Sequence, residues 1–183
     1  ITFKELKDSF NIVFNALHGE YGEDGAVQKI LDGLKIPYTG SDYKTSKTGM
    51  DKVLCHKIFQ KNKISSPQFA LNPNLSKLKK IGLPLVIKPI DRGSSVGVSV
   101  INDWKLLPTA ISNAEKYSSK IMFQKYIKGR EFTCGVIQVG KKIIPLVPTE
   151  IIPVKSKFFD YKAKYTSGAS KEITPPNLPS SKI

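Results

Sequence analysis

The apolar positions of the first sixty residues predict one strand followed by helices. A short apolar run bounded by polar residues, 11–17, predicts a buried strand that ends in a glycine-rich turn. Apolar residues recur at helical spacing over 26–35, and this helix is expected to close before a proline. Residues 38–41 break the pattern and open a polar linker, and residues 50–59 predict the next amphipathic helix. A strand, a loop and a helix in this order are typical of an α/β fold.

The middle of the chain alternates short strands with helices. Residues 67–71 predict a short strand, and residues 75–81 predict a helical turn or two. Residues 85–90 and 98–101 predict two strands that pair like a hairpin, with glycine and serine in the loop between them. Asp103 is a suitable N-cap for the next helix, because its carboxylate can accept a hydrogen bond from a free backbone N–H.

The last third of the chain predicts strands and then a loop. Residues 121–127 and 131–139 are expected to be strands joined by a short basic turn. Residues 143–152 predict a third strand, and its prolines favour an edge position because proline cannot donate to a sheet. Beyond Pro153 the pattern is loop-like.

The composition is that of a folded protein with a large core. Of its 183 residues, 40% are hydrophobic, which is too many for a disordered chain. It contains no run of about eighteen apolar residues, so no transmembrane segment is expected. The charged start of the chain lacks the apolar region of a signal peptide. Cys55 and Cys134 lie inside apolar patterns, and we expect buried free thiols in a cytoplasmic protein.

The net charge of +14 raises the question of nucleic-acid binding. The lysines are spread along the chain, and no predicted helix carries a stripe of basic and aromatic residues. A solvated, lysine-rich surface that faces anionic ligands explains this charge better. A basic nucleic-acid-binding module stays as a distant alternative.

The candidate chemistry is concentrated in residues 86–98. Lys88 interrupts an apolar strand that has no packing reason to contain an ammonium group. Such a lysine can also extend to solvent from a strand end. The loop that follows, however, offers backbone N–H groups that no bulky side chain covers, and a fixed cation beside such a loop suits a polyphosphate. The segment therefore predicts the nucleotide-binding loop of an ATP-using enzyme.

Five motifs support this interpretation, and they occur in one order along nearly the whole chain. They are His-Gly-x-x-Gly-Glu-Asp-Gly at 18–25, Gly-Met-Asp-Lys at 49–52, Lys-Pro-x-x-x-Gly-Ser-Ser-Val-Gly at 88–97, Gly-x-Glu-Phe-Thr at 129–133 and Tyr-x-Ala-Lys-Tyr at 161–165. With these motifs the sequence resembles the D-alanine–D-alanine ligase family of the ATP-grasp superfamily. The loop at 93–97 lies between two predicted strands, which separates it from a P-loop or a Rossmann turn.

The resemblance implies an α/β (α+β) architecture of the ATP-grasp type, in which a central ATP-binding domain carries parts of two flanking domains. Residues 1–43 would end the amino-terminal substrate domain. Residues 44–133 would form the central domain, and 134–183 would begin the carboxy-terminal domain with its active-site loop. The chain would then be an internal fragment.

The resemblance also implies an ATP site. The lysines matching Lys52 and Lys88 hold the phosphates in the family, although Lys52 taken alone would be an ordinary surface lysine. The loop with Gly93, Ser94 and Ser95 covers those phosphates.

The adenosine end is implied by residues of three segments. Gln124, Lys125 and Tyr126 match a segment that contacts adenine, partly through its backbone; the family usually has glutamate at the position of Gln124. Glu131 matches the ligand of the ribose hydroxyls. Val98 and Phe158 would wall the adenine pocket.

The substrate end is implied by fewer residues. Ser94 and Tyr165 match a serine and a tyrosine that link a loop over the active site and orient the first D-alanine. His18 and Glu23 match positions near that substrate, although a histidine can simply end a strand and an acidic residue can complement a helix N-terminus. Lys164 would face the γ-phosphate when the loop closes.

The implied reaction joins two D-alanines, for peptidoglycan synthesis, through an acyl phosphate made with ATP. Mg²⁺, or Mn²⁺ in its place, would assist; its ligands and the oxyanion arginine are expected outside this chain, so the fragment alone is expected to be inactive. The intact enzyme is expected to be a homodimer that binds ATP and D-alanine, and neither nucleic acid nor membrane. Alternatives within the superfamily are a D-alanine–D-lactate or D-serine ligase and another carboxylate–amine ligase. Tyr165 resembles the amino-acid-accepting enzymes and disfavours lactate.

Overall fold

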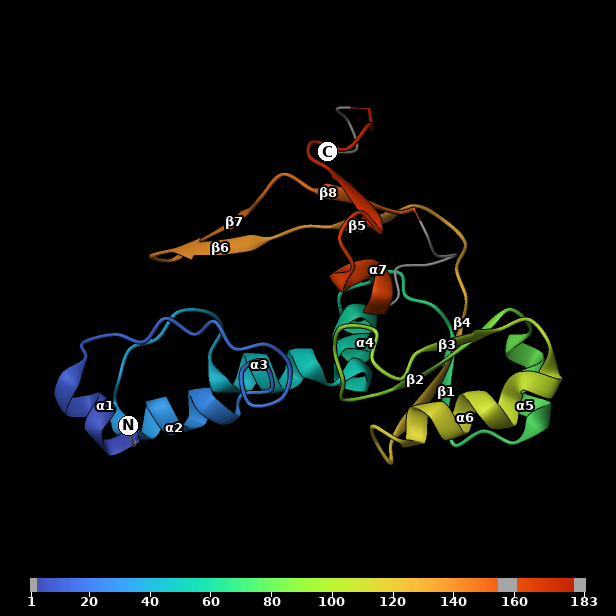
Figure 1. Cartoon of the computed structure of the whole chain (residues 1–183), viewed down its shortest axis with the longest axis horizontal. Coiled ribbons are helices and arrows are strands. Elements are labelled where there is room, and N and C mark those ends of the chain that lie inside the picture. The colour runs from blue at the N-terminus through green and yellow to red at the C-terminus, as the bar shows by residue number, and fades with distance from the viewer. Residues whose placement is uncertain (1–2, 155–160, 180–183) are drawn as a thin grey trace. The chain divides into compact units, whose positions relative to one another are not determined.

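The fold is described from a computed structural model, which covers residues 3–154 and 161–179. The chain forms two compact units, Ile1–Tyr126 and Ile127–Ile183 (Figure 1). Within the first unit, α2 (Ala26–Leu34) contacts both α1 (Phe3–Ser9) and α3 (Tyr43–Met50), so the described start of the chain packs with the helices that follow it. The three-part division expected from the sequence stays a prediction.

The first unit is built around a four-stranded antiparallel sheet. Its strands lie in the order β1 (Phe69–Leu71), β4 (Ile121–Lys125), β2 (Leu85–Pro89) and β3 (Ser99–Ile101). The pairing of β2 with β3 confirms the predicted hairpin-like pair on either side of the glycine loop.

Two helices cover one face of this sheet and form the core with it. Because strand residues alternate between faces, Leu85 and Ile87 of β2 point to the same side as Phe123 of β4. They cluster there with apolar residues of α5 (Leu75–Ile81) and α6 (Leu107–Glu115). The opposite face carries Lys88 and Gln124, so one sheet separates the core from the candidate site.

The helices of the first unit begin where the sequence supplies caps. Asp51 accepts hydrogen bonds from the backbone of Val53 and Leu54 and starts α4 (Lys52–Lys61). Asn74 caps α5 in the same way. Asp103, predicted as an N-cap, caps the short 3₁₀ helix η1 (Trp104–Leu106), which runs into α6.

The amino-terminal part departs from two predictions. Helix α2 (Ala26–Leu34) is confirmed, and α1 (Phe3–Ser9) precedes it. The polar linker, however, contains a further helix, α3 (Tyr43–Met50), which is capped by Asp42. The prediction of a single helix over 50–59 is therefore wrong at its start, because Asp51 ends α3 and begins α4.

The prediction of a buried strand over 11–17 is also wrong. In this segment only Val13 forms a β-bridge, a parallel one to Tyr38. Phe14 is 78% exposed and Ile12 60% exposed. An apolar run becomes a buried strand only where other strands and a covering layer meet it, and the described residues supply neither at this point.

The second unit contains two small antiparallel sheets. Strand β8 (Thr149–Pro153) lies between β5 (Glu131–Thr133) and β9 (Ser170–Ile173), and β6 (Val136–Val139) pairs with β7 (Lys142–Pro145). Helix α7 (Tyr161–Tyr165) precedes β9. The described helices of both units are too short or too polar to cross a bilayer.

Three predictions for this unit, and one for the two cysteines of the chain, need correction. The expected strands 131–139 and 143–152 each divide in two, and β8 is a central strand rather than an edge. The carboxy-terminal region is not all loop, because it supplies α7 and β9. Both cysteines are free thiols as expected, but Cys134, in the connection between β5 and β6, is exposed, and Cys55 is only half-buried.

Candidate functional site

Lys88 is the centre of the candidate site. It follows Val86 by two residues on β2, and Val86 lies opposite Gln124 on β4, so both side chains share one face of the sheet. The Lys88 Nζ donates a hydrogen bond of 2.6 Å to the Gln124 Oε1. Burial, together with the nearby charge of Lys52, lowers the pKa of Lys88 to about 8.

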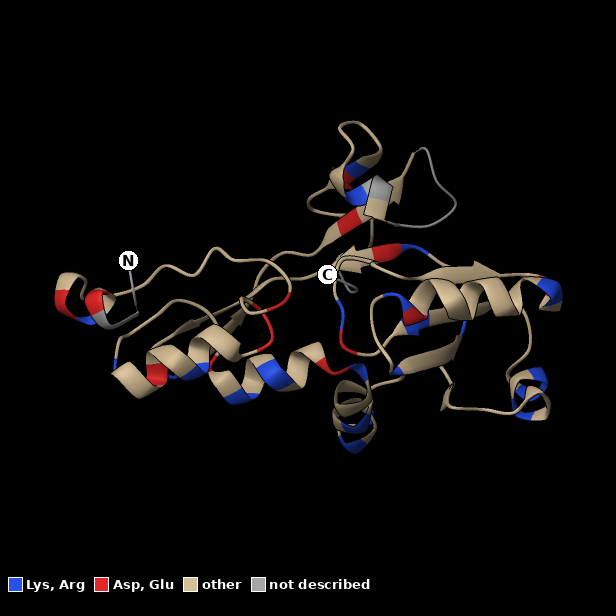
Figure 2. Cartoon of the chain, turned by 60° about the horizontal axis from the view of Figure 1, so that its bottom comes forward, with Lys and Arg blue, Asp and Glu red and all other residues tan. Residues whose placement is uncertain are grey.

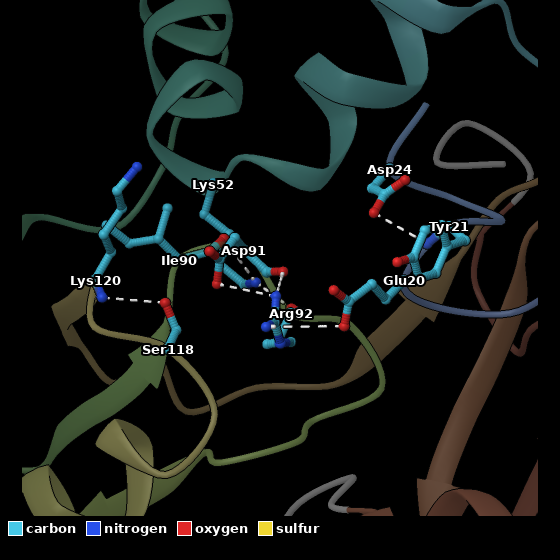
Figure 3. Close-up of polar contacts among 9 residues, drawn as sticks. All are labelled: Glu20, Tyr21, Asp24, Lys52, Ile90, Asp91, Arg92, Ser118 and Lys120. Carbon is cyan, nitrogen blue, oxygen red and sulfur yellow. Dashed lines mark hydrogen bonds and ion pairs between the residues drawn. The ribbon is translucent and has the colours of Figure 1, made fainter. Parts of the chain in front are cut away.

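Lys52 approaches the same strand end from the first residue of α4. Its Nζ donates to the carbonyl oxygen of Ile90 at 3.1 Å and to that of Arg92 (Figure 3). Its backbone N–H also donates to the Ile90 carbonyl, which fixes the start of α4 on the end of β2. Burial lowers the pKa of Lys52, and the charge of Asp91 opposes this effect.

Neither lysine forms an ion pair with a carboxylate within the described part of the chain. Their ammonium groups meet carbonyl oxygens and one amide instead. Two partly buried cations without an ion-paired carboxylate favour an anionic ligand, because such a ligand would stabilise their charged forms.

The glycine loop has the backbone that a phosphate-binding loop needs. Ser94 and Ser95 lie in succession in the left-handed region, with φ values of 50° and 59°. Such conformations are costly for residues other than glycine, and turns of this kind are where backbone N–H groups can form anion-binding concavities. Gly97 has a φ of 69°, and a Cβ there would lie 2.8 Å from the Tyr117 ring, so this position requires glycine.

The first unit also brings the loop at 18–25 to the glycine loop. A pocket of about 160 Å³ is lined by Gly19, Met50 and Ser94 among others. Arg92 lies 3.9 Å from Glu20 across this contact (Figure 3). The predicted substrate residues His18 and Glu23 line a neighbouring pocket of about 790 Å³.

Local hydrogen bonds shape the loop at 18–25. The Glu23 Oε2 accepts from the Gly19 backbone N–H at 2.7 Å, and Asp24 accepts from Tyr21 at 3.0 Å. A Cβ at Gly22 would lie 2.4 Å from that of Leu17, so the turn can close only on glycine. The structure thus supports Glu23 as a loop-forming residue and leaves its predicted substrate role as a prediction.

The residues predicted to contact adenine do not all lie on the face of the sheet that carries Lys88. Gln124 is 7% exposed and touches Lys88, and Val98 lies half-buried just before β3. Lys125 points away from that face, and its Nζ donates to the Leu83 carbonyl at 3.4 Å. The backbone N–H groups of Lys125 and Tyr126 already donate to Gln68 and Pro84, so only their carbonyls stay available to a ligand.

The remaining predicted residues belong to the second unit. Partial burial raises the pKa of Glu131, and the Lys164 ammonium opposes this shift. The Tyr165 ring lies 4.7 Å from that of Tyr161 within α7. Phe158 lies outside the described residues.

The sequence did not point to His56, although its side chain contacts Gln124, the hydrogen-bond partner of Lys88. His56 is 7% exposed, and its Nε2 lies 2.8 Å from the Gln124 Nε2. The signal available in the sequence was its spacing of four residues from Lys52, which places both on one face of α4.

The donor set fits a nucleotide better than a metal. The two lysines and the left-handed serines suit phosphate oxygens. Among the residues described, no three His, Cys, Asp or Glu side chains converge on a common point. Basic side chains elsewhere are spread over elements of both units rather than gathered on one (Figure 2).

Comparisons with known proteins agree with the motifs. A family model described as "D-ala D-ala ligase C-terminus" matches residues 46–182, and one described as "D-ala D-ala ligase N-terminus" matches residues 1–41. An enzyme named D-alanine--D-alanine ligase from Pseudothermotoga lettingae is 39% identical over 175 residues, which cover 95% of this chain and 57% of that protein.

Two solved structures are also similar. The D-alanine--D-alanine ligase from Bacillus anthracis complexed with ATP is 32% identical, with a TM-score of 0.78 over 97% of this chain and 56% of that one. The VanG D-Ala:D-Ser ligase from Enterococcus faecalis is 32% identical, with a TM-score of 0.79 over 93% and 51%. These likenesses confirm the predicted ATP-grasp fold. The chain spans little more than half the length of these relatives.

Proposed function

This chain belongs to the D-alanine–D-alanine ligase family, and we propose that the whole protein joins two D-alanines at the expense of ATP. The carboxylate of the first D-alanine attacks the γ-phosphate of ATP, ADP leaves, and an acyl phosphate forms. The amine of the second D-alanine attacks that acyl group, and phosphate leaves. The dipeptide would serve peptidoglycan synthesis.

One observation carries this proposal. Lys52 and Lys88 both lie near the end of β2, and both are partly buried without an ion-paired carboxylate in the described chain. A triphosphate supplies the negative charge that both lysines lack. Fixed charges in a site that excludes water stabilise the developing charge of phosphoryl transfer most effectively.

The other residues take the roles that the motifs suggest. The left-handed Ser94 and Ser95 would direct backbone N–H groups and hydroxyls at the phosphates. The Glu131 carboxylate would accept from the ribose hydroxyls, and Tyr165 and Lys164 would act from α7 as the loop closes over the acyl phosphate. His18 and Glu23 would lie near the first D-alanine.

The remaining features of the whole protein rest on the family alone. Magnesium would supply positive charge to the phosphates when bound, and no residue of this chain is proposed as its ligand. We also propose a cytoplasmic location, because the reaction consumes cytoplasmic ATP. The homodimer is proposed from the resemblance to the family. The basic surface would then be a solvated face rather than a nucleic-acid site.

A second acceptor, D-serine, is supported by the likeness to the VanG ligase. Lactate is disfavoured by Tyr165, which resembles the amino-acid-accepting enzymes.

The test is an acceptor series with the full-length protein. Purified protein is incubated with ATP, Mg²⁺ and D-alanine, alone or with D-serine or D-lactate, and products are separated by mass. We expect D-alanyl-D-alanine as the main product together with one ADP per dipeptide. ATP-independent product, or no product with any of the three acceptors, would overturn the proposal.

A further inference from the structure

His56 lies in a buried chain of side chains behind the candidate nucleotide site. The Lys88 Nζ donates to the Gln124 Oε1 at 2.6 Å, and the Gln124 Nε2 lies 2.8 Å from the His56 Nε2. The side chains come from β2, β4 and α4, so three elements meet in this contact.

The chemistry of these groups fixes the direction of both hydrogen bonds. An ammonium can only donate, so the Gln124 oxygen must face Lys88 and its NH₂ must face His56. The NH₂ group can also only donate, so the His56 Nε2 must accept. A histidine that accepts at Nε2 is neutral and carries its proton on Nδ1.

The surroundings of His56 favour this neutral form. From β1 the Phe69 ring stacks against it with centroids 4.5 Å apart, and Phe59 of α4 contacts its edge at 6.2 Å. The charged group that acts on it is Lys88 on β2. Within the described residues no carboxylate pairs with it, and its Nδ1 is buried without a hydrogen-bond partner.

We propose that His56 is a positioning residue for the nucleotide: its neutral imidazole fixes the Gln124 amide, and that amide holds the Lys88 ammonium in place. This inference rests on the proposed function for the identity of the ligand, but the contact itself does not.

Protonation of His56 would undo the arrangement. The imidazolium would donate at both nitrogens, so two donors would face each other between His56 and Gln124. The amide would have to rotate, and its NH₂ would then face the Lys88 ammonium. Burial and the charge of Lys88 both lower the pKa of His56 below its ordinary value, which keeps the arrangement intact at neutral pH.

Gln124 adds to burial and to the charge of Lys88 in favouring the neutral histidine, because its NH₂ can only donate to His56. A glutamate at this position, which is usual in the family, could accept from Lys88 and from a protonated histidine at once. The substitution Gln124→Glu should therefore raise the pKa of His56 above its ordinary value. A histidine that only fills space beside Phe69 would show no such response to a change of hydrogen-bond type.

The first experiment measures the histidine directly. The full-length protein, labelled with ¹⁵N and ¹³C at histidine, is titrated by NMR without nucleotide, and His56 is assigned by the signal that disappears in His56→Gln. We expect the tautomer protonated at Nδ1 at pH 7, a midpoint below 6.5, and a midpoint above 6.5 in Gln124→Glu. The other tautomer, a native midpoint at or above 6.5, or no response to Gln124→Glu would overturn the proposal.

The second experiment connects His56 to the nucleotide. The dissociation constant of ATP is measured by calorimetry between pH 5.5 and 7.5 for the native protein and three variants. His56→Leu should weaken binding at pH 7.5 by about two- to tenfold, the value of ordering one long side chain in advance. His56→Gln, whose oxygen can take the place of Nε2, should bind more tightly than His56→Leu and lack the acidic decline of the native protein. Lys57→Gln, which removes an exposed charge from the next position of α4, controls for the change in helix charge.

The outcomes of the two experiments separate the inference from the proposed function. An acidic decline shared by native protein and His56→Gln would overturn the inference, since ATP titration alone would then explain it. Absence of ATP binding by the native protein at every pH would overturn the proposed function, and the NMR titration would still decide whether Gln124 holds His56 neutral.

Discussion

The two units each hold a cation against a side chain of a neighbouring strand, but the two partners differ in charge. In the second unit Arg130 donates two hydrogen bonds of 2.6 Å to the carboxylate of Glu150, which is 5% exposed. In the first unit Lys88 donates one bond of 2.6 Å to the neutral amide of Gln124. The distances are equal, and the electrostatic outcomes are opposite.

The pKa values express this difference. The hydrogen bonds from Arg130 lower the pKa of Glu150, so that pair is stable as two charges. Burial lowers the pKa of Lys88, so its charged form is disfavoured in the folded protein. The Arg130–Glu150 ion pair stabilises the second unit, whereas Lys88, which has no ion-pair partner in the described chain, gains favourable interaction energy when an anion binds.

The largest effect is expected from removing the unmatched charge. Lys88→Met in the full-length enzyme should lower kcat/KM for ligation by about 10²–10³, or about 3–4 kcal/mol, as for the loss of one preorganised charged contact. The melting temperature should change little, because the charge lost was a costly one in the fold. Steady-state ligation assays and calorimetric melts measure the two effects. Lys79→Met on the exposed side of α5 is the control, and unchanged turnover in Lys88→Met would reject the role of Lys88.

The matched charge should behave in the opposite way. Arg130→Met should lower the melting temperature of the second unit, because it leaves the Glu150 carboxylate buried without its partner. In the native protein the lowered pKa of Glu150 contributes stability above the ordinary carboxyl pKa, and this stability is lost as the pH falls through the lowered value. The variant should thus differ most from the native protein at pH 7 and least in acid. Lys128→Met, a nearby exposed change, should melt like the native protein, and equal melting of Arg130→Met would contradict the comparison.

The sequence predicted best what local signals determine. The apolar spacing over 75–81 was enough for α5, and the apolar runs around the glycine loop were enough for β2 and β3. The lysine of the site was also visible, because an ammonium inside an apolar strand is unusual whatever the strand's neighbours are.

Features that depend on distant parts of the chain were missed. The apolar run at 11–17 needed strand partners to become a buried strand, and in the described part of the chain its one β-bridge joins Val13 to Tyr38. The central place of β8 depends on β9, which follows it after a helix. His56 lies 68 positions from Gln124, and no spacing rule joins a helix to a strand at that separation.

Gly97 tests whether the glycine loop must keep its conformation. Gly97→Ala should destabilise the first unit by about 1–3 kcal/mol, because it combines a φ of 69° with a close approach to Tyr117 and Pro89. Gly33→Ala is the matched control: it lies within α2 with open space around it, and it should stabilise by about 0.5–1 kcal/mol. Urea unfolding measures both changes. Equal and favourable effects of the two substitutions would show that the loop tolerates a side chain at position 97.

The smallest expected effect is the dependence of folding stability and ATP affinity on pH. Because the folded pKa of Lys88 is about 8 and its unfolded value is near 10.5, the unfolded state binds more protons between these values. The free energy of unfolding should therefore rise with pH in this window.

The affinity for ATP should fall over the same window by about two- to tenfold, because the neutral amine loses its attraction for phosphate. Lys88→Arg keeps its charge throughout and should lack this alkaline decline, even if its affinity at pH 7 is lower. Calorimetric titrations and urea unfolding at pH 7.5, 8.5 and 9.5 supply both curves. Stability and affinity that move in the same direction would mean that Lys88 already has its counterion within the fold, as Arg130 has.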